Sequence, residues 1–393
     1  MRSDVISLYK KVRISDICEV FDGPHATPKK TERGPVYLGI DSITDDGHIN
    51  PAGFNHLSFD DYKIWTKRVV PQENDVVFTY EATLGRYALI PKDFYGCLGR
   101  RIALVRAKDD SINPRWLLYY FLSPGWKSFI DSRTVIGSTV NRIPIKAFPD
   151  YEIDMPPRNI QDKIASILGD IDDRIETNKK LNDNLLQQAI AIFNDRYDSA
   201  DKRCPFTSLI HVLGGGTPKT GNPEFWNGDI PFFTPKDVGS PYTFQTEKTI
   251  TATGLEHCNS RLYPENTSFV TARGTVGKVS LAGKPMAMNQ SCYALASDSI
   301  DPILVYFYTL RAVDSLKHKA SGAVFDAIVT RDFETEVVSI IPETESEAIL
   351  ALIAPMMKAI HSNAEESIRL AALRDTLLPR LMSGEIDVSS ITL

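Results

Sequence analysis

The second half of the chain repeats the first, and this repeat limits the possible folds more than any other feature of the sequence. Residues 137–168 align without a gap with residues 322–353, at an offset of 185 positions. The aligned identities are Gly137 with Gly322, Ile143 with Ile328, Phe148 with Phe333, Pro157 with Pro342, and Ile164 with Ile349. Self-similarity at a fixed offset is the signature of a repeated structural unit. We therefore predict two copies of one folding unit in this chain of 393 residues.

The elements before this alignment recur in the same order. Residues 71–77 resemble residues 264–270, and each segment precedes a loop with the pattern Thr-x-Gly-basic, at 83–86 and 275–278. Short β-rich segments bounded by turn residues predict the strands, at 36–43, 75–79, 101–106, 230–234, 267–271 and 293–296. Apolar helices at about 113–131 and 301–319 would pack on them. Because helices and strands do not alternate regularly, the predicted fold class is α+β.

Each copy ends in a long segment with helical periodicity. Apolar residues recur at intervals of mostly three and four, as in a coiled-coil seam. In the first copy they are Ile160, Ile164, Ile167, Ile171, Ile175, Leu185, Ala189 and Ile192; in the second they are Ile349, Leu352, Met356, Ile360, Leu370 and Leu377. The first helix, from Asn159 to about Tyr197, would span roughly 60 Å at 1.5 Å per residue.

Two arrangements of these helices are compatible with the pattern. Each amphipathic helix can lie on its own globular unit, or the two helices can pair antiparallel as a spacer. We favour pairing, because an isolated helix of this kind needs a packing partner and because these helices are longer than one small unit can cover. Asn178 and Asn363 occupy equivalent positions on the two seams, where a buried Asn fixes helix register.

These boundaries divide the chain into four parts. The predicted recognition or binding units are residues 1–155 and 201–340, and the helical regions are residues 156–200 and 341–393. The net charge of −6 argues against nucleic-acid binding by itself. The four parts in chain order carry +1, −2, −1 and −4, however, so the net acidity lies mainly in the helical regions.

Basic side chains of the globular units gather in loops that are rich in Gly and Thr. Backbone amides, hydroxyls and Lys or Arg suit phosphate binding, whereas Arg, Asn and Gln also read base edges. Any one of these loops can be a simple exposed turn, but their repetition in both copies favours DNA binding. The candidate DNA-binding residues are Lys29, Lys30, Arg33, Arg86, Arg101, Arg142, Lys219, Arg273, Lys278, Asn289 and Gln290.

Motifs typical of catalysis, metal binding or membrane insertion are missing from the sequence. There is no phosphate loop, nucleophile elbow or dinucleotide fingerprint, and the histidines do not cluster at metal-ligand spacing. The five cysteines are scattered, so we expect neither a disulfide framework nor a zinc site. The longest apolar stretches are far shorter than a membrane-spanning helix needs, and the N-terminus has no export signal. We expect a cytoplasmic, non-catalytic protein without a bound cofactor.

Several strings resemble the specificity subunit of type I restriction-modification systems. The most specific is GGTPKTGNPEFWNGDIPFFTPKDV at 215–238, with a diverged copy, FDGPHATPKKTERGPVYLGIDSI, at 21–43. The segments SFVTARGTVGKVSLA (268–282), MNQSCYAL (288–295) and LRDTLLPRLMSGEI (373–386) are also similar to the family. The copies differ where Tyr80-Glu81-Ala82 stands in place of Ala272-Arg273-Gly274.

This resemblance implies two target recognition domains that each read one half of a bipartite site in double-stranded DNA. It also implies that the two helices form an antiparallel spacer, and that two methyltransferase subunits and motor-nuclease restriction subunits are the partners. The methyl donor would then belong to the methyltransferase subunits. Two alternatives stay open from the residues alone: a two-lobed scaffold that binds protein or carbohydrate without DNA, and an enzyme with an unrecognised site.

Overall fold

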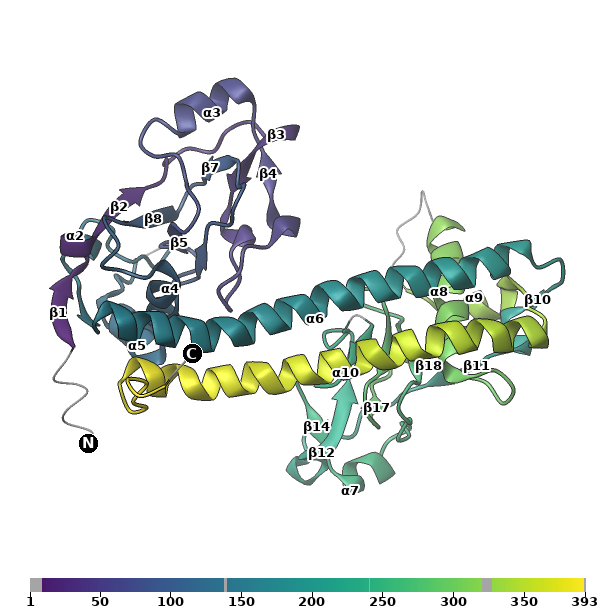
Figure 1. Cartoon of the computed structure of the whole chain (residues 1–393). Helices are drawn as coiled ribbons and strands as arrows, with labels where there is room; N and C mark the ends of the chain where they lie inside the picture. Colours follow the sequence, from purple (N-terminus) through teal and green to yellow (C-terminus); the bar gives the residue numbers. More distant parts are fainter. Residues whose placement is uncertain (1–8, 138–139, 240, 320–326, 392–393) are drawn as a thin grey trace. The chain divides into compact units, whose positions relative to one another are not determined.

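The computed structural model of the protein describes residues 9–137, 140–239, 241–319 and 327–391 (Figure 1). The chain divides into two compact units. Unit 1 comprises residues 1–174 and 370–393, and unit 2 comprises residues 175–369. Two long helices, α6 (Arg158–Ser199) and α10 (Glu343–Met382), each contribute one segment to each unit.

Unit 1 contains three sheets and four short helices within its described residues. The main antiparallel sheet has the order β2-β8-β5-β6, made of β2 (Cys18–Asp22), β8 (Ile102–Ala107), β5 (Val76–Thr79) and β6 (Tyr87–Leu89). A second sheet has the order β4-β3-β7, made of β4 (Asn55–His56), β3 (Thr31–Leu38) and β7 (Gly96–Leu98). The third pairs β1 (Lys10–Arg13) with β9 (Glu152–Met155). The helices are α2 (Ile14–Ile17), α3 (Phe59–Trp65), α4 (Pro114–Leu122) and α5 (Pro124–Arg133).

Unit 2 has the same plan with one added strand. Its main sheet has the order β11-β18-β15-β16-β13, made of β11 (His211–Gly214), β18 (Cys292–Ala296), β15 (Ser268–Thr271), β16 (Val279–Ala282) and β13 (Tyr242–Thr243). The second sheet joins β14 (Thr249–Ile250), β12 (Trp226–Phe233) and β17 (Ala287–Met288), and β10 (Arg203–Pro205) pairs with β19 (Val337–Ser339). The helices are α7 (Ala252–Glu256), α8 (Pro302–Lys319) and α9 (Thr330–Thr335). The strand orders match element by element, so the predicted α+β repeat is confirmed.

Alternation along the buried strands of the main sheet divides their apolar side chains between two cores, one on each face of the sheet. In β5 of unit 1, Val76 and Phe78 face the helices α4 and α5, whereas Val77 faces the smaller sheet. Successive side chains of a strand point to opposite faces, so a strand that is covered on both faces is apolar throughout. Strand β5 is buried at all four positions for this reason.

Two predicted elements differ in extent from the structure. Strand β3 begins at Thr31 and ends at Leu38, and a 3-10 turn at Ile40–Ser42 occupies the end of the predicted strand 36–43. The predicted helix at 113–131 is two helices, because Ser123 adopts extended backbone geometry and caps α5 through Trp126 N–H. Pro124 then occupies the first position of α5, where its missing N–H leaves no unpaired donor.

The long helices pack on the globular part of each unit and on each other. In unit 1, Ile164 and Leu168 of α6 and Leu381 of α10 join the core beside α4. In unit 2, Phe193 of α6 and Ile353 of α10 pack against α8. Both arrangements that the sequence left open therefore occur together within each unit.

The seam of α10 contains the predicted residues Ile349 and Ile360, which are buried, but it differs from the prediction between them. The predicted Leu352 is 57% exposed, whereas Ile353 is fully buried. Met357 is buried as well, next to the predicted Met356. Where two apolar residues are adjacent in the sequence, either of them fits the spacing of three and four, so the spacing alone does not say which one is buried. None of the helices in the described ranges combines the length and apolar character that a membrane crossing requires.

Candidate functional site

Three loops of each unit come together at the ends of the strands. In unit 1 they are loop A (residues 23–30, after β2), loop B (80–86, between β5 and β6) and loop C (99–101, between β7 and β8). In unit 2 the equivalents are loop A′ (215–222, after β11), loop B′ (272–278, between β15 and β16) and loop C′ (289–291, between β17 and β18). Most of the predicted DNA-binding residues lie in these loops.

Backbone hydrogen bonds hold the three loops of unit 1 together. The N–H of Tyr80 in loop B donates to the carbonyl of Arg101 in loop C at 3.1 Å. The N–H of Gly23 in loop A donates to the carbonyl of Ile102, directly after loop C, at 3.0 Å. On the other side of loop B, Ile143 N–H donates to the Tyr80 carbonyl at 2.8 Å. The loops thus form one continuous surface.

Unit 2 repeats two of these contacts at equivalent atoms and holds loop A′ by a different backbone hydrogen bond. Ala272 N–H of loop B′ donates to the carbonyl of Ser291 in loop C′ at 2.8 Å. Gly216 N–H of loop A′ donates to the Met288 carbonyl at 3.2 Å, and Ile328 N–H donates to the Ala272 carbonyl at 2.9 Å. Ile143 and Ile328 are identical residues of the alignment at the 185-residue offset. Gly322 of that alignment lies outside the described residues.

The Thr-x-Gly-basic pattern forms the same tight turn in both units. Gly85 and Gly277 have φ angles of 70° and 73°, a region that only glycine enters without steric cost. Their N–H groups donate to the carbonyls of Thr79 at 2.9 Å and Thr271 at 2.8 Å. The turn presents the basic residue that follows, which is Arg86 in unit 1 and Lys278 in unit 2.

The predicted cations of unit 1 fall into two groups. Lys29, Lys30 and Arg33 are exposed at the end of loop A and the start of β3. Arg86 is instead held by Asp45 through two hydrogen bonds, Nε to Oδ1 at 2.8 Å and Nη2 to Oδ2 at 3.0 Å.

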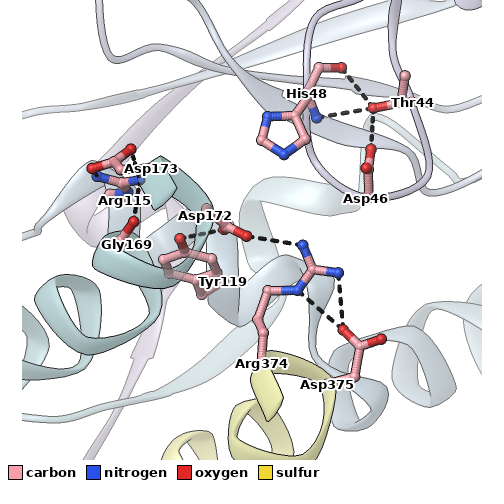
Figure 2. Close-up of polar contacts among 10 residues, drawn as sticks. All are labelled: Thr44, Asp46, His48, Arg115, Tyr119, Gly169, Asp172, Asp173, Arg374 and Asp375. Atoms are coloured by element: carbon pink, nitrogen blue, oxygen red, sulfur yellow. Dashed lines mark hydrogen bonds and ion pairs between the residues drawn. The ribbon is translucent and has the colours of Figure 1, made fainter. Parts of the chain in front are cut away.

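Carboxylates near loops B and C reduce the free positive charge of unit 1. Arg101 Nε lies 3.3 Å from Oε1 of Glu81, a residue of loop B. Next to Asp45 in the sequence, the Thr44 hydroxyl bonds Asp46, and His48 N–H donates to that hydroxyl at 3.0 Å (Figure 2). Arg142 is exposed and its backbone pairs with Val135, while residues 138–139 of its loop lie outside the described ranges.

Unit 2 leaves its loop cations open to solvent. Lys219, Arg273 and Lys278 are exposed, and no ion pair to them occurs among the described residues. Asn289 is half-buried, and its side-chain oxygen accepts from Ser291 N–H at 3.0 Å. The Gln290 side-chain oxygen accepts from the Thr217 hydroxyl, which joins loop C′ to loop A′. Asn289 and Gln290 therefore shape the surface as well as lying on it.

The predicted register residues of the long helices contact each other's helix in unit 2. Asn178 is fully buried, and its Nδ2 donates to Oε2 of Glu366 at 2.8 Å and to the Asn363 carbonyl at 3.3 Å. Asn363 Nδ2 donates to Oδ1 of Asn182 at 2.9 Å. Asn182 was not predicted, although the 185-residue offset pairs it with a polar residue, Ser367.

A second polar link joins the helices in unit 1, and sequence reasoning missed it entirely (Figure 2). Asp172 of α6 is buried; its Oδ2 accepts from the Tyr119 hydroxyl at 2.6 Å and its Oδ1 from Arg374 Nη1 at 2.9 Å. Burial, and then the neighbouring Asp172 carboxylate, raise the pKa of Tyr119. Beside this cluster, Arg115 binds both carboxylate oxygens of Asp173, at 2.9 and 2.7 Å.

The equivalent positions of unit 2 are apolar. At the 185-residue offset, Asp172 corresponds to Met357 and Arg374 corresponds to Ala189. Both of these residues are fully buried in the core of unit 2. The equivalent positions of the two long helices therefore carry an ion pair in unit 1 and apolar side chains in unit 2.

No group of three or more His, Cys, Asp or Glu side chains within the described ranges is arranged to hold a metal ion. The features of the site are hydrogen-bond donors, cations and glycine turns. Such a surface suits recognition of an anionic polymer, through phosphate contacts and through contacts with base edges.

Comparison with known proteins gives one consistent family. A family model described as the type I restriction modification DNA specificity domain matches residues 6–187 and 206–370. The HindI specificity subunit of Haemophilus influenzae is 22% identical, over 77% of this chain and 84% of the relative. The putative MjaX specificity subunit of Methanocaldococcus jannaschii is 22% identical, over 96% of this chain and 93% of the relative.

A shorter match and a solved structure agree with these relatives. The MjaIX specificity subunit of Methanocaldococcus jannaschii is 32% identical over 120 residues, which cover 29% of this chain and 28% of that relative. The crystal structure of the type I restriction-modification S subunit from M. genitalium matches with a TM-score of 0.59 at 15% identity. The match covers 95% of this chain and 96% of that one, and it establishes likeness of fold.

Proposed function

The chain belongs to the type I restriction modification DNA specificity family, and on that basis we propose that each unit reads one half of a bipartite site in double-stranded DNA. The chain is the DNA sequence-specificity subunit of a type I restriction-modification system, with two target recognition domains, and not its catalytic subunit. The observation that carries the two-half proposal is the repeated three-loop surface. Equivalent backbone hydrogen bonds hold loops B and C and loops B′ and C′ together, but different side chains line the two surfaces.

The two surfaces are predicted to read different half-sites. Tyr80 and Ala272 are buried, but the next residue differs in charge: loop B presents Glu81 where loop B′ presents Arg273. Base readout depends on the hydrogen-bonding groups that reach the groove, so surfaces that differ in this way select different bases. A single chain with two such surfaces has no reason to prefer a palindrome, unlike a symmetric dimer.

The recognition domains are proposed to be residues 1–155 and 201–340, with helical regions at 156–200 and 341–393. Helices α6 and α10 begin within a few residues of the proposed ends of the two domains. In this proposal the antiparallel helices set the number of unread base pairs between the half-sites, and Asn178 and Asn363 fix their register.

The proposed partners are two methyltransferase subunits, one for each copy, and motor-nuclease restriction subunits that join for cleavage. An apolar groove on the helices of unit 2 supports a protein partner; Ile192, Ile349 and the exposed Leu352 line it, in a volume of about 690 Å³. The methyl donor would be bound by the methyltransferase subunits. A complex that modifies chromosomal DNA works in the cytoplasm, which is the proposed location.

Exchange of one recognition domain tests the two-half proposal. Residues 201–340 are replaced by the equivalent domain of a relative, and methylated sites are mapped across the genome with the partner subunits present. We expect one half-site to change and the other half-site to stay the same. Two unchanged half-sites, or two changed ones, would contradict modular reading.

An insertion tests the spacer separately. Four residues, about one helical turn, are added to α6 near Asn178, with a compensating insertion near Asn363 in α10. The expected result is a different gap between unchanged half-sites. An unaltered gap would show that the helices do not set it.

The scaffold alternative is tested by the salt dependence of DNA affinity. If the DNA affinity of the chain together with its partners does not change with salt concentration, the scaffold alternative is favoured.

A further inference from the structure

We propose that the segment directly after the small helix of each unit forms a fourth part of the DNA-binding surface and binds backbone phosphates. These post-helix segments are residues 66–70, after α3, and residues 257–262, after α7. The binding side chains would be Lys67 and Arg68 in unit 1 and Arg261 in unit 2. The inference rests on the proposed function, because it names further contacts with the same DNA.

In unit 1 the post-helix segment and loop A form the two sides of one cavity of about 480 Å³. Asp22 at the end of β2 and residues 23–26 of loop A form one side, and the other side contains Trp65 at the end of α3, Lys67 and Arg68. Arg68 Nη1 donates to the backbone carbonyl of Asp22 at 3.3 Å, which fixes the segment against the loop. Lys67 and Arg68 are both exposed at the rim.

The charge around this cavity favours an anion. Asp22 is the acidic residue among those that line it, and its Oδ2 lies 3.0 Å from His25 Nε2. Arg68 contacts the backbone and not the carboxylate of Asp22. The side chains of Lys67 and Arg68 therefore remain for a ligand, and Lys29 and Lys30 lie at the end of the same loop A.

Unit 2 places its post-helix segment against the same loops by different contacts. A Cβ atom on Gly216 of loop A′ would lie 2.6 Å from the backbone nitrogen of Asn259, so the segment and the loop touch. The hydroxyl of Ser260 accepts from Met288 N–H at 3.0 Å, directly before loop C′. Arg261 follows and is exposed. Both copies thus carry an arginine at one edge of the three-loop surface.

Phosphate is the chemistry that fits these side chains. They are exposed, long and flexible, whereas base readout needs donors held in a fixed geometry. Phosphate contacts add affinity without sequence preference and release counterions, so each one adds about 0.9 to the slope of log affinity against log salt concentration. In unit 1 they would supplement loops whose Arg86 and Arg101 already face carboxylates.

The test measures DNA affinity of the complete complex as a function of salt, with a duplex that carries the methylation site. The variants are Lys67→Gln with Arg68→Gln, and separately Arg261→Gln. We expect the slope to fall by about 2 for the first and by about 1 for the second. Affinity should fall equally for cognate and unrelated duplexes, and the methylated sequence should stay the same.

Matched controls remove cations that lie outside the proposed surface. Lys63→Gln removes a charge of α3 itself, whose Nζ is already paired with Asp60 at 3.1 Å. Lys202→Gln removes an exposed charge next to β10 in unit 2. If the controls lower the slope as much as the variants do, or if the variants leave it unchanged, the assignment is wrong. A change in the methylated sequence would also overturn it, because it would make these residues base readers.

The same experiment separates this inference from the proposed function. A complex with the wild-type chain that shows no salt-dependent preference for its DNA would contradict the proposed function. A complex with normal wild-type binding and unaltered variants would contradict the post-helix segments alone. Normal assembly of each variant with the methyltransferase subunits, checked by size-exclusion chromatography, excludes misfolding as the cause of a loss.

Discussion

The basic side chains of the three-loop surfaces differ between the units in what surrounds them. Arg86 is neutralised by Asp45 and Arg101 by Glu81, whereas Arg273 and Lys278 are exposed to solvent. DNA must displace a carboxylate to reach Arg86, because a guanidinium that is bidentate to one anion has few donors left for another. The two units should therefore contribute unequally to DNA affinity.

Removal of the competing carboxylate tests this inequality. Asp45→Asn should raise DNA affinity of the complex and steepen its salt slope by about 1, because Arg86 becomes available to phosphate. Asp46→Asn is the matched control. It removes the same charge from the next residue, whose side chain bonds the Thr44 hydroxyl instead of Arg86. Equal effects of the two substitutions would point to overall charge and not to release of Arg86.

Cysteine reactivity is a second residue-scale prediction. Burial raises the pKa of Cys18, Cys97 and Cys292 to about 12, so these thiols stay protonated in the folded chain at neutral pH and lack the reactive thiolate. Cys204 and Cys258 are half-buried. Alkylation of the native chain at pH 8, followed by mass spectrometry, should modify Cys204 and Cys258 first. Rapid labelling of Cys292 would contradict the packing of strand β18.

At the scale of elements, the contact between α6 and α10 in unit 1 depends on a buried ion pair. The side chains of Asp172 and Arg374 are 9% and 15% exposed, and the Tyr119 hydroxyl completes the bonding of the carboxylate. Loss of Arg374 leaves the buried Asp172 carboxylate without its cation, which costs about 3–5 kcal/mol. Loss of Asp172 leaves Arg374 with a second partner, because Arg374 Nε and Nη2 also donate to Asp375 Oδ1 at 3.0 and 2.9 Å (Figure 2). Replacement of both partners by apolar residues is often neutral.

Unit 2 supplies the apolar replacement for this test. Arg374→Ala alone should destabilise the chain by about 3–5 kcal/mol. Asp172→Met alone should cost less than that, because Arg374 keeps its bonds to Asp375. The double substitution, which installs the Met357 and Ala189 pair of unit 2, should also cost less than Arg374→Ala alone. Denaturant unfolding of the full chain measures the differences. Asp173→Asn is the control, because Asp173 is 64% exposed and surface ion pairs contribute about 1 kcal/mol or less. Additive losses in the double variant would contradict direct coupling.

At the scale of the whole molecule, charge is distributed according to the proposed partners. The net charge of −6 lies mainly in the helical regions, and the two globular units are close to neutral. Near-neutral units attract DNA weakly over long distances, because the electrostatic contribution grows with the number of phosphates neutralised. Additional cationic surface must therefore come from the partner subunits.

The isolated chain should accordingly bind its DNA site weakly, with a shallow salt slope, and the complex with methyltransferase subunits should bind tightly with a steep one. Titration of one labelled duplex with each preparation at several salt concentrations measures both slopes. A scrambled duplex serves as the control for sequence preference. An isolated chain that binds as tightly as the complex would contradict this division of charge.

The sequence by itself determined the repeat, the α+β class, the two long helices and the family resemblance. These features are local or periodic: apolar spacing, glycine turns and repeated strings are visible in a window of a few residues. The bounds of helices and the buried faces of helices were less well predicted. The helix predicted at 113–131 divides into two at Ser123, and Ile353 is buried in α10 where Leu352 was expected.

Only the tertiary structure decided which basic side chains are free of carboxylate partners and which residues join the two long helices within each unit. Arg86 meets Asp45 across 41 residues, and Arg374 meets Asp172 across 202 residues. The post-helix segments also reach loops A and A′ only through the fold. Pairings at such separations follow from how whole elements pack, because the side chains that meet share no local pattern. The sequence therefore predicted where the cations gather, and the fold decided which of them remain for DNA.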